Sequence, residues 1–165
     1  MNMTGAFRGK IVLAGIVAGC FLFWAYSARA SLGGDESSVE ADATALQGQI
    51  SAPTEQDLNQ SSSYSVKSFV SGDGTSVREY FAPSGSVFGV VWRGRRPANL
   101  SVLLGPYYSE YLAASRNRDH ISLHHAVIQG PNSVVILNGR MGSLMGHAYV
   151  PNLAPSGVDA KSVVK

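Results

Sequence analysis

Four histidines, His120, His124, His125 and His147, are the side chains of this chain most able to bind a metal ion. Imidazole nitrogens are common ligands of zinc and copper. On an extended strand, His120 and His124 would project from one face about 13 Å apart, too far to share one ion. On a helix the same spacing would bring them together, with His147 as a third ligand. No H-E-x-x-H motif accompanies them. The pattern favours solvent-facing or capping histidines, and a metal centre at His120, His124 and His147 is the alternative.

Nucleophilic and acid–base catalysis find little support in the sequence. No serine lies in a G-x-S-x-G turn, and the single cysteine, Cys20, lies in an apolar leader. A carboxylate pair for hydrolysis would have to come from Glu79, Glu110 and Asp119, and no pattern brings two of them together. Glu79 adjoins Arg78, which favours a surface ion pair on the polar face of a sheet. We therefore predict no catalytic residue and no cofactor.

The one dense basic cluster is formed by Arg93, Arg95 and Arg96, on a loop with Gly94 and Pro97. Guanidinium groups match phosphate oxygens, so these arginines are candidates for binding an anion such as a lipid phosphate or a polyanionic envelope component. The alternative is a solvated loop that neutralises acidic residues nearer the N-terminus.

Aromatic residues form the second candidate for ligand binding. Tyr107, Tyr108 and Tyr111, with Trp92, have the residue types that line glycan and peptide grooves. Packing of a helix on a sheet is the simpler explanation for the same four side chains.

The N-terminal thirty residues have the three parts of a secretory signal peptide. Arg8 and Lys10 precede an apolar run over residues 11–26, and Ala28-Arg29-Ala30 supplies small residues at the −3 and −1 positions. We predict cleavage between Ala30 and Ser31, and a periplasmic or secreted mature protein without a membrane span.

Two other fates of this leader are open. An uncleaved anchor helix would need about 20 apolar residues, and this run is shorter. Val17-Ala18-Gly19-Cys20 resembles the lipobox of bacterial lipoproteins, which would place a lipid anchor on Cys20. The residues after Cys20 remain apolar, whereas a lipoprotein usually continues into a polar tether, so an ordinary leader residue is favoured.

The charge balance of the mature chain gives no reason to expect nucleic acid as a partner. Three of the thirteen basic residues precede Ser31 and none of the eleven acidic ones does, which leaves ten basic and eleven acidic residues. A nearly neutral chain lacks the positive potential that phosphate backbones require. The partner is instead expected to be an envelope protein or ligand of unknown kind.

Three regions follow from composition: the signal peptide over 1–30, an acidic, serine- and alanine-rich region over 31–63, and a folded domain over 64–165. In the second region, residues 35–47 have helical spacing with acidic residues near the N-terminus, and a linker follows Gly48.

Alternating patterns in the third region predict two groups of three strands. The first group is residues 64–70, 76–81 and the nearly continuous apolar run 87–92, which suggests a central strand. The second group is residues 121–128, 133–137 and 144–150. Between them, residues 100–115 have helical spacing with a bend at Gly105-Pro106, and the tail from Pro151 is expected to pack as an extended cap or to fray. The prediction is an α+β fold: an antiparallel sheet from two three-stranded meanders, a bent helix on one face, and an N-terminal helix and linker.

Five short motifs in this order resemble the bacterial family called domain of unknown function 2844, over nearly all of the mature chain. They are Leu32-Gly33-Gly34, Val77-Arg78-Glu79-Tyr80, Val87-Phe88-Gly89-Val90-Val91-Trp92-Arg93-Gly94, Leu103-Leu104-Gly105 and Gly146-His147-Ala148-Tyr149-Val150-Pro151. The resemblance implies an uncharacterised protein exported from the cytoplasm of Gram-negative bacteria, and it implies no chemistry or catalytic residues.

Together these patterns lead us to expect a non-enzymatic binding or accessory module of the cell envelope, acting through its sheet surface and the loop of Arg93, Arg95 and Arg96. The alternative is a metal-dependent or hydrolytic periplasmic enzyme that uses the histidines.

Overall fold

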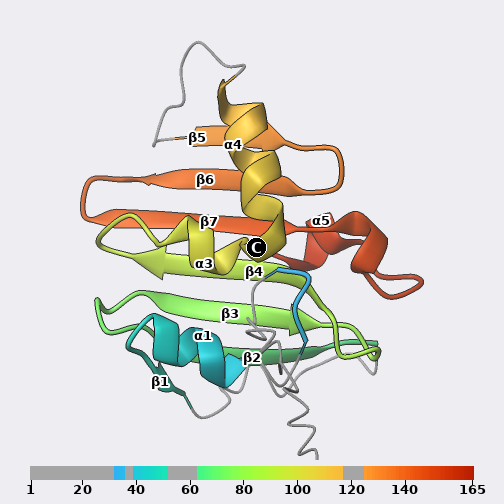
Figure 1. Cartoon of the computed structure of the whole chain (residues 1–165), viewed down its shortest axis with the longest axis horizontal. Helices are drawn as coiled ribbons and strands as arrows, with labels where there is room; N and C mark the ends of the chain where they lie inside the picture. The colour runs from blue at the N-terminus through green and yellow to red at the C-terminus, as the bar shows by residue number, and fades with distance from the viewer. Residues whose placement is uncertain (1–31, 36–38, 52–62, 117–124) are drawn as a thin grey trace, which may run out of the picture.

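The computed structural model describes residues 32–35, 39–51, 63–116 and 125–165 of the chain (Figure 1). They form a seven-stranded sheet in the order β1-β2-β3-β4-β7-β6-β5, in which every neighbouring pair is antiparallel. The strands are β1 (Gln49–Ile50), β2 (Ser65–Val70), β3 (Ser76–Phe81), β4 (Val87–Gly94), β5 (His125–Gln129), β6 (Val134–Arg140) and β7 (Ser143–Tyr149).

The predicted α+β class with an antiparallel sheet is confirmed, but the strand order is not that of two simple meanders. β7 returns to pair with β4, so that both groups of strands form one continuous sheet, and β1 adds a further strand at one edge. The apolar run of β4 explains this arrangement. Because its four residues from Val87 to Val90 are all buried, this strand is stable only between two neighbours and under cover on both faces.

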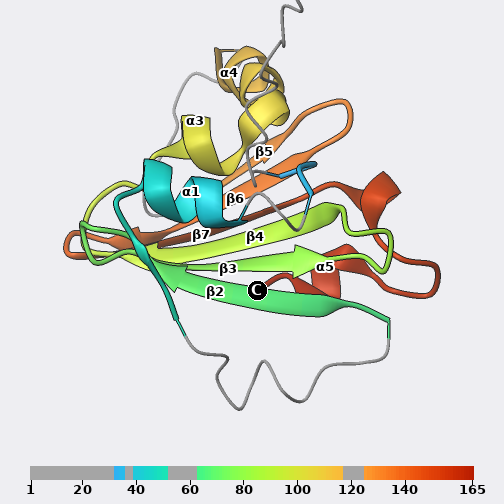
Figure 2. The same ribbon diagram turned by 60° about the horizontal axis from the view of Figure 1, so that its bottom comes forward.

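Three helical pieces follow β4 and cover one face of the sheet (Figure 2). They are α3 (Leu100–Leu103), the 3-10 turn η2 (Gly105–Tyr107) and α4 (Tyr108–Arg116). The predicted bend falls in η2, where Gly105 has a positive φ of 46° and Pro106 lies in the first turn. Leu103 and Leu104 are buried against the sheet.

The segment before the sheet also packs into the core. Leu32 is fully buried, and its backbone N–H donates to the Leu103 carbonyl at 3.1 Å. Helix α1 (Val39–Ala45) is shorter than the predicted 35–47: Asp35 forms an isolated bridge with Ser86 instead. Val39 and Ala43 of α1 are buried in the main core.

Residues 49 and 50 form β1, where the sequence indicated a linker. Gly48 permits this close approach, because a Cβ atom there would lie 2.5 Å from the Val70 carbonyl oxygen. In the second group of strands, β5 begins at His125 and residues 117–124 lie outside the described residues, so the predicted strand start at 121 is untested.

The C-terminal tail is more ordered than expected. It forms the 3-10 turn η3 (Pro151–Leu153) and the short helix α5 (Ala160–Val163), which Asp159 caps by accepting from the Lys161 N–H at 3.1 Å. Val164, directly after α5, is fully buried, and its side chain occupies the space that a Cβ on Gly89 would need.

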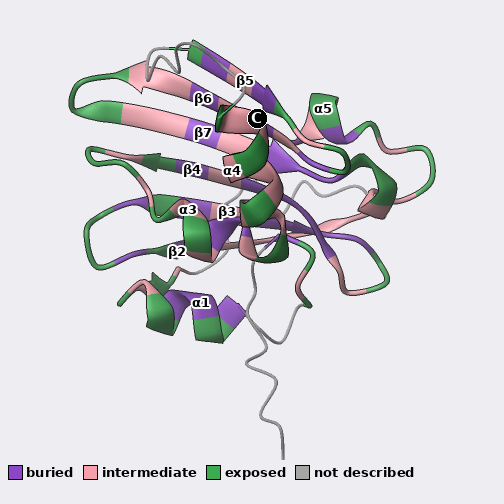
Figure 3. Cartoon of the chain, turned by 45° about the horizontal axis from the view of Figure 1, so that its top comes forward, coloured by how far each residue is buried: buried purple, intermediate pink, exposed green. Residues whose placement is uncertain are grey.

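Two apolar clusters therefore lie on opposite faces of the sheet. The larger one joins the sheet to α1, α3 and α4, and the smaller one joins Tyr80, Phe88 and Tyr149 to α5. Buried residues run through the middle of the sheet, whereas exposed residues gather at the tips of the turns and on the outer sides of the helices (Figure 3). Because α5 covers only one end of its face, the rest of that face is left uncovered by the described helices.

Candidate anion-binding site on the open face of the sheet

We call the uncovered part of the sheet the open face, and strand register defines one row of six side chains across it. Each is paired with the next by Cα register, and each is partly exposed. The row runs Ser68, Arg78, Val91, His147, Ile136, Val127. It is polar on β2 and β3 and apolar on β6 and β5.

A cavity of about 410 Å³ lies over the polar end of this row. Its lining includes four basic side chains and three serines and no acidic side chain. The basic groups are Arg78, Arg93, His147 and Lys165, and the serines are Ser51, Ser68 and Ser76. The cavity therefore presents hydrogen-bond donors and positively charged side chains with no acidic side chain among them, and the carboxyl group of Lys165 is the one acidic group in its lining.

Arg78 and Arg93 are placed by the pairing of β3 with β4. Arg78 lies opposite Val91, so Arg93 is its diagonal neighbour, at a Cα separation of about 7–8 Å that long side chains bridge. Arg78 Nη2 donates to the backbone oxygen of Lys165 at 3.0 Å, which fixes the guanidinium over the sheet. Arg93 is exposed and has no ion pair within the described part of the chain.

His147 lies on β7 beside this pair, opposite both Val91 and Ile136. The ring is half-buried, and desolvation lowers the pKa of His147 below its usual value. At neutral pH the imidazole is therefore uncharged and offers one N–H donor, and it gains a positive charge as the pH falls.

These donors suit an anion better than any other ligand. Guanidinium forks bind phosphate, sulfate and carboxylate oxygens with short charge-assisted hydrogen bonds, and serine hydroxyls and an imidazole N–H complete the coordination. The rigid pairing of β3, β4 and β7 holds the donors in place without a ligand.

Of the three arginines predicted to bind an anion, only Arg93 lines the cavity. Arg95 and Arg96 are exposed on the loop after β4. Sequence reasoning missed Arg78 because it assigned that residue to an ion pair with Glu79. The alternation in Val77-Arg78-Glu79 already places the two side chains on opposite faces.

The prediction that Glu79 forms a surface ion pair is wrong. Glu79 lies beside Val77 on the face under α1, where it is 1% exposed, and neither carboxylate oxygen has a hydrogen-bond partner. Burial raises the pKa of Glu79 well above its usual value, the nearby Asp42 raises it further, and Lys67 opposes the shift. Glu79 is therefore a buried core residue and not part of a surface ion pair.

The other carboxylates of the sequence analysis do not join Glu79. Glu110 on α4 accepts from the backbone N–H of Asn132 at 3.2 Å and from its Nδ2 at 2.8 Å, which ties α4 to the turn between β5 and β6. Asp119 lies outside the described residues. Glu79 on β3 and Glu110 beside the β5–β6 turn are thus separated by several strands of the sheet.

The histidines are separated in the structure as far as it describes them. His125 on β5 and His147 on β7 have β6 between them, and His125 Nδ1 lies 2.6 Å from Asn138 Oδ1. The described residues contain no group of three or more His, Cys, Asp or Glu side chains able to hold a metal ion. His120 and His124 lie outside these residues, so a metal centre that includes them stays a prediction.

The predicted aromatic groove exists in part. Trp92 and Tyr111 line a pocket of about 200 Å³ between the helices and the sheet, whereas Tyr107 and Tyr108 do not. The rings of Tyr108 and Tyr111 stack with centroids 5.9 Å apart, and all three tyrosines pack against the main core. Helix packing accounts for most of this aromatic cluster.

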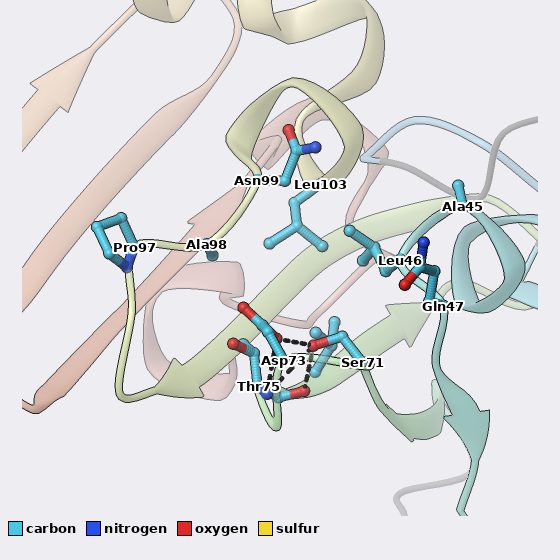
Figure 4. A pocket seen from close by; sticks show the side chains of 11 residues that line it. Ala45, Leu46, Gln47, Ser71, Asp73, Thr75, Pro97, Ala98, Asn99 and Leu103 are labelled. Carbon is cyan, nitrogen blue, oxygen red and sulfur yellow. Dashed lines mark hydrogen bonds between the residues drawn. The ribbon is translucent and has the colours of Figure 1, made fainter.

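A further cavity of about 270 Å³ lies between the end of α1, the β2–β3 turn and residues 97–99 (Figure 4). Its polar side chains largely satisfy one another. Ser71 Oγ donates to Asp73 Oδ1, which also accepts from the Thr75 N–H at 3.0 Å. The Ser71 hydrogen bond, the largest cause, lowers the pKa of Asp73. These bonds are those of a turn, so the cavity is a weaker candidate than the one on the open face.

Fold and site define an α+β protein with a cationic cavity on the free face of an antiparallel sheet. By its sequence the chain belongs to the family described as Protein of unknown function (DUF2844), whose profile matches residues 28–163. That range holds Arg78, Arg93 and His147. No curated protein and no solved structure shows detectable similarity to the chain. Within the described residues, no helix has the length and apolar character needed to span a membrane.

Proposed function

We propose that this protein is an exported binding module of the cell envelope that holds an anionic group in the open-face cavity, without catalysing a reaction on it. The observation that carries the proposal is the lining of this cavity: Arg78, Arg93, Lys165 and His147 lie there with no acidic side chain. Phosphate, sulfate and carboxylate are the ligand groups that such a lining favours.

The arrangement of the strands supports a binding role. Arg78, Arg93 and His147 lie on neighbouring strands in the middle of the sheet, where the backbone is held on both edges. A site on such strands keeps its geometry, which favours selective binding of one group. No Asp or Glu side chain lines the cavity, so the lining lacks the acidic side chain with which His147 would form an acid–base pair.

The export half of the proposal rests on the leader and on the position of Leu32. Cleavage between Ala30 and Ser31 would leave Leu32 as the second residue, and Leu32 is already fully buried beside Leu103. The first residue that the structure describes therefore lies directly after the predicted cleavage site and is part of the core. Processing at Cys20 would leave the same fold on a lipid anchor.

Sulfate binding to the chain from Ser31 onward, measured by isothermal titration calorimetry at low ionic strength, tests the binding site. We expect Arg78→Gln and Arg93→Gln each to weaken sulfate binding about tenfold or more, the usual loss of a charge-assisted hydrogen bond. Arg95→Gln is the matched control, because it removes the same charge two residues away from Arg93 and outside the cavity. Equal losses in all three variants would show general charge attraction and would refute the site.

Export is tested separately, by the intact mass of the protein recovered from the periplasm and from the membranes of an expressing Gram-negative host. A soluble species that begins at Ser31 supports the proposal. A species acylated on Cys20, or one that retains Met1, places the domain at a membrane surface and contradicts cleavage after Ala30.

A further inference from the structure

The open face carries an apolar stripe next to the cationic cavity. Val91, Ile136 and Val127 occupy successive positions of the same cross-strand row as Arg78, and each is partly exposed. Val91 and Ile136 border the cluster under α5 without being enclosed by it. The solvated face of an antiparallel sheet normally carries polar side chains at such positions.

The stripe and the cavity form one continuous surface. Val91 lines the cavity and lies directly opposite Arg78, and His147 separates Val91 from Ile136. Arg78 and Ile136 lie on β3 and β6, three strand spacings apart, which is about 14 Å. Met145 lies beside this path, lines the same cavity, and has the flexible side chain that adapts to apolar ligands of varied shape.

We propose that the ligand of this face is a single-chain anionic amphiphile, whose head group binds Arg78 and Arg93 and whose aliphatic tail lies across Val91 and Ile136. The inference rests on the proposed function, because it assigns a tail to the anion that the cavity holds. Charge complementarity fixes the orientation: the head group must lie over β3 and β4, where the arginines are, and the tail must run toward β6 and β5, where the row has no charged residue.

The side chains of the stripe favour an alkyl tail over a sugar or a peptide. Along the row itself the stripe offers branched aliphatic side chains and no hydrogen-bonding group beyond His147. Of the polar side chains that flank it on the same face, His125 and Asn138 already contact each other. A sugar or a peptide lying along the row would therefore lose hydrogen bonds with water. An alkyl chain gains free energy for each methylene removed from water.

Alkyl phosphates of increasing length provide the test: methyl, butyl, hexyl and octyl phosphate, each below its micelle concentration, titrated into the chain from Ser31 onward at constant ionic strength. We expect the affinity to rise by about twofold to fourfold for each methylene that reaches the stripe. Ile136→Thr keeps a β-branched side chain, and should weaken the chain-length dependence while leaving methyl phosphate binding unchanged. Val70→Thr is the control, because Val70 is an exposed valine of β2 outside the cavity lining.

The outcomes separate the two proposals. An affinity that does not depend on chain length overturns the amphiphile, while methyl phosphate binding that requires Arg78 still supports the anion site. An affinity that rises with chain length equally in the wild type and in Ile136→Thr overturns the placement of the tail. Failure of every alkyl phosphate to bind overturns both proposals. Unchanged circular dichroism of each variant shows that the loss is local.

Discussion

Glu79 on β3 lies directly opposite Lys67 on β2, on the face of the sheet that α1 covers. Asp42 of α1 is also buried and acts electrostatically on Glu79, so three ionisable groups meet under a seven-residue helix. The carboxylate of Glu79 has no hydrogen-bond partner, and its burial favours the protonated form. The stability of this protein must therefore depend on the protonation of one core residue.

Replacing Glu79 with glutamine should make the protein more stable at alkaline pH and leave it little changed in acid. The folded-state pKa of Glu79 is raised above its unfolded value, so its contribution is most favourable below the unfolded pKa of about 4.3 and is lost as the pH rises through the folded pKa. Urea unfolding of wild type and Glu79→Gln between pH 4 and pH 9 measures this. We expect a gain on the order of 1–3 kcal/mol at the upper end of the range.

The matched control for this experiment is Glu40→Gln. Glu40 lies on α1 two residues before Asp42, and it is exposed. Its replacement should shift the unfolding midpoint little and should not flatten the pH profile. A wild-type profile that already rises toward alkaline pH would contradict the proposed protonation of Glu79.

Gly146 on β7 faces the ring of Trp92, and the two residues are paired across β4 and β7. A Cβ atom on Gly146 would lie 2.4 Å from Trp92 Cζ2 and 2.9 Å from the Ile136 carbonyl oxygen. Because the ring is buried and the carbonyl belongs to the neighbouring strand, neither can move away cheaply. We expect Gly146→Ala to destabilise the protein by about 1–3 kcal/mol or more in urea unfolding, the usual effect of overpacking.

Gly89→Ala is the informative comparison for Gly146→Ala. A Cβ atom on Gly89 would lie 2.3 Å from Cγ2 of Val164. Val164, however, belongs to the short C-terminal segment. That segment can shift, so the loss of stability should be smaller than for Gly146→Ala. The opposite ranking would mean that the C-terminal segment is held more firmly than β7.

Local patterns in the sequence predicted the strands well because period-two alternation and turn residues are short-range signals. The apolar run 87–92 alone predicted a central strand, and β4 covers this run. The pairing of β4 with β7 was out of reach, since it joins residues fifty to sixty positions apart. The same reason hid the site: Arg93 stood out in a basic cluster, whereas Arg78 becomes a site residue only through β4 and through Lys165.

Glu79 shows a different failure, because its place was within reach. Val77, Glu79 and Phe81 share one side of a strand by alternation, and two of the three are large and apolar. The carboxylate of Glu79, between Val77 and Phe81, is therefore buried whenever this side of the sheet is covered. The adjacent Arg78 instead led to the prediction of a surface ion pair, and the structure shows that this prediction was wrong.

Glu110 should stabilise the turn between β5 and β6 at neutral pH. Its carboxylate accepts from Asn132 twice and from Ser133 Oγ at 3.1 Å, and the Asn132 side chain is the main cause of a lowered pKa for Glu110. A lowered folded-state pKa gives stability that is present above the unfolded pKa and is lost as the pH falls through the folded pKa.

We therefore expect Glu110→Ala to cost about 1–2 kcal/mol at pH 7 and less below pH 4. A double-mutant cycle with Asn132→Ala isolates the side-chain contact, since both single variants remove the hydrogen bond from Asn132 Nδ2 to Glu110 Oε1. The two losses should fall well short of additive. Full additivity would show that Glu110 acts elsewhere.

Sulfate binding to the open-face cavity should strengthen as the pH falls from 8 to 5. His147 lines this cavity with Arg78 and Arg93, and burial lowers the pKa of His147, so its ring is neutral at pH 8 and gains charge in acid. Sulfate is the right probe because its own charge stays constant over this range, so any change in affinity reports on the protein.

His147→Gln keeps a donor but cannot ionise. This variant should bind sulfate at pH 8 nearly as well as the wild type, but its affinity should not increase at pH 5. His125→Gln removes a histidine from the same sheet outside the cavity, and should keep the increase. If both variants keep it, the charge that strengthens binding lies on another group and His147 has no part in the site.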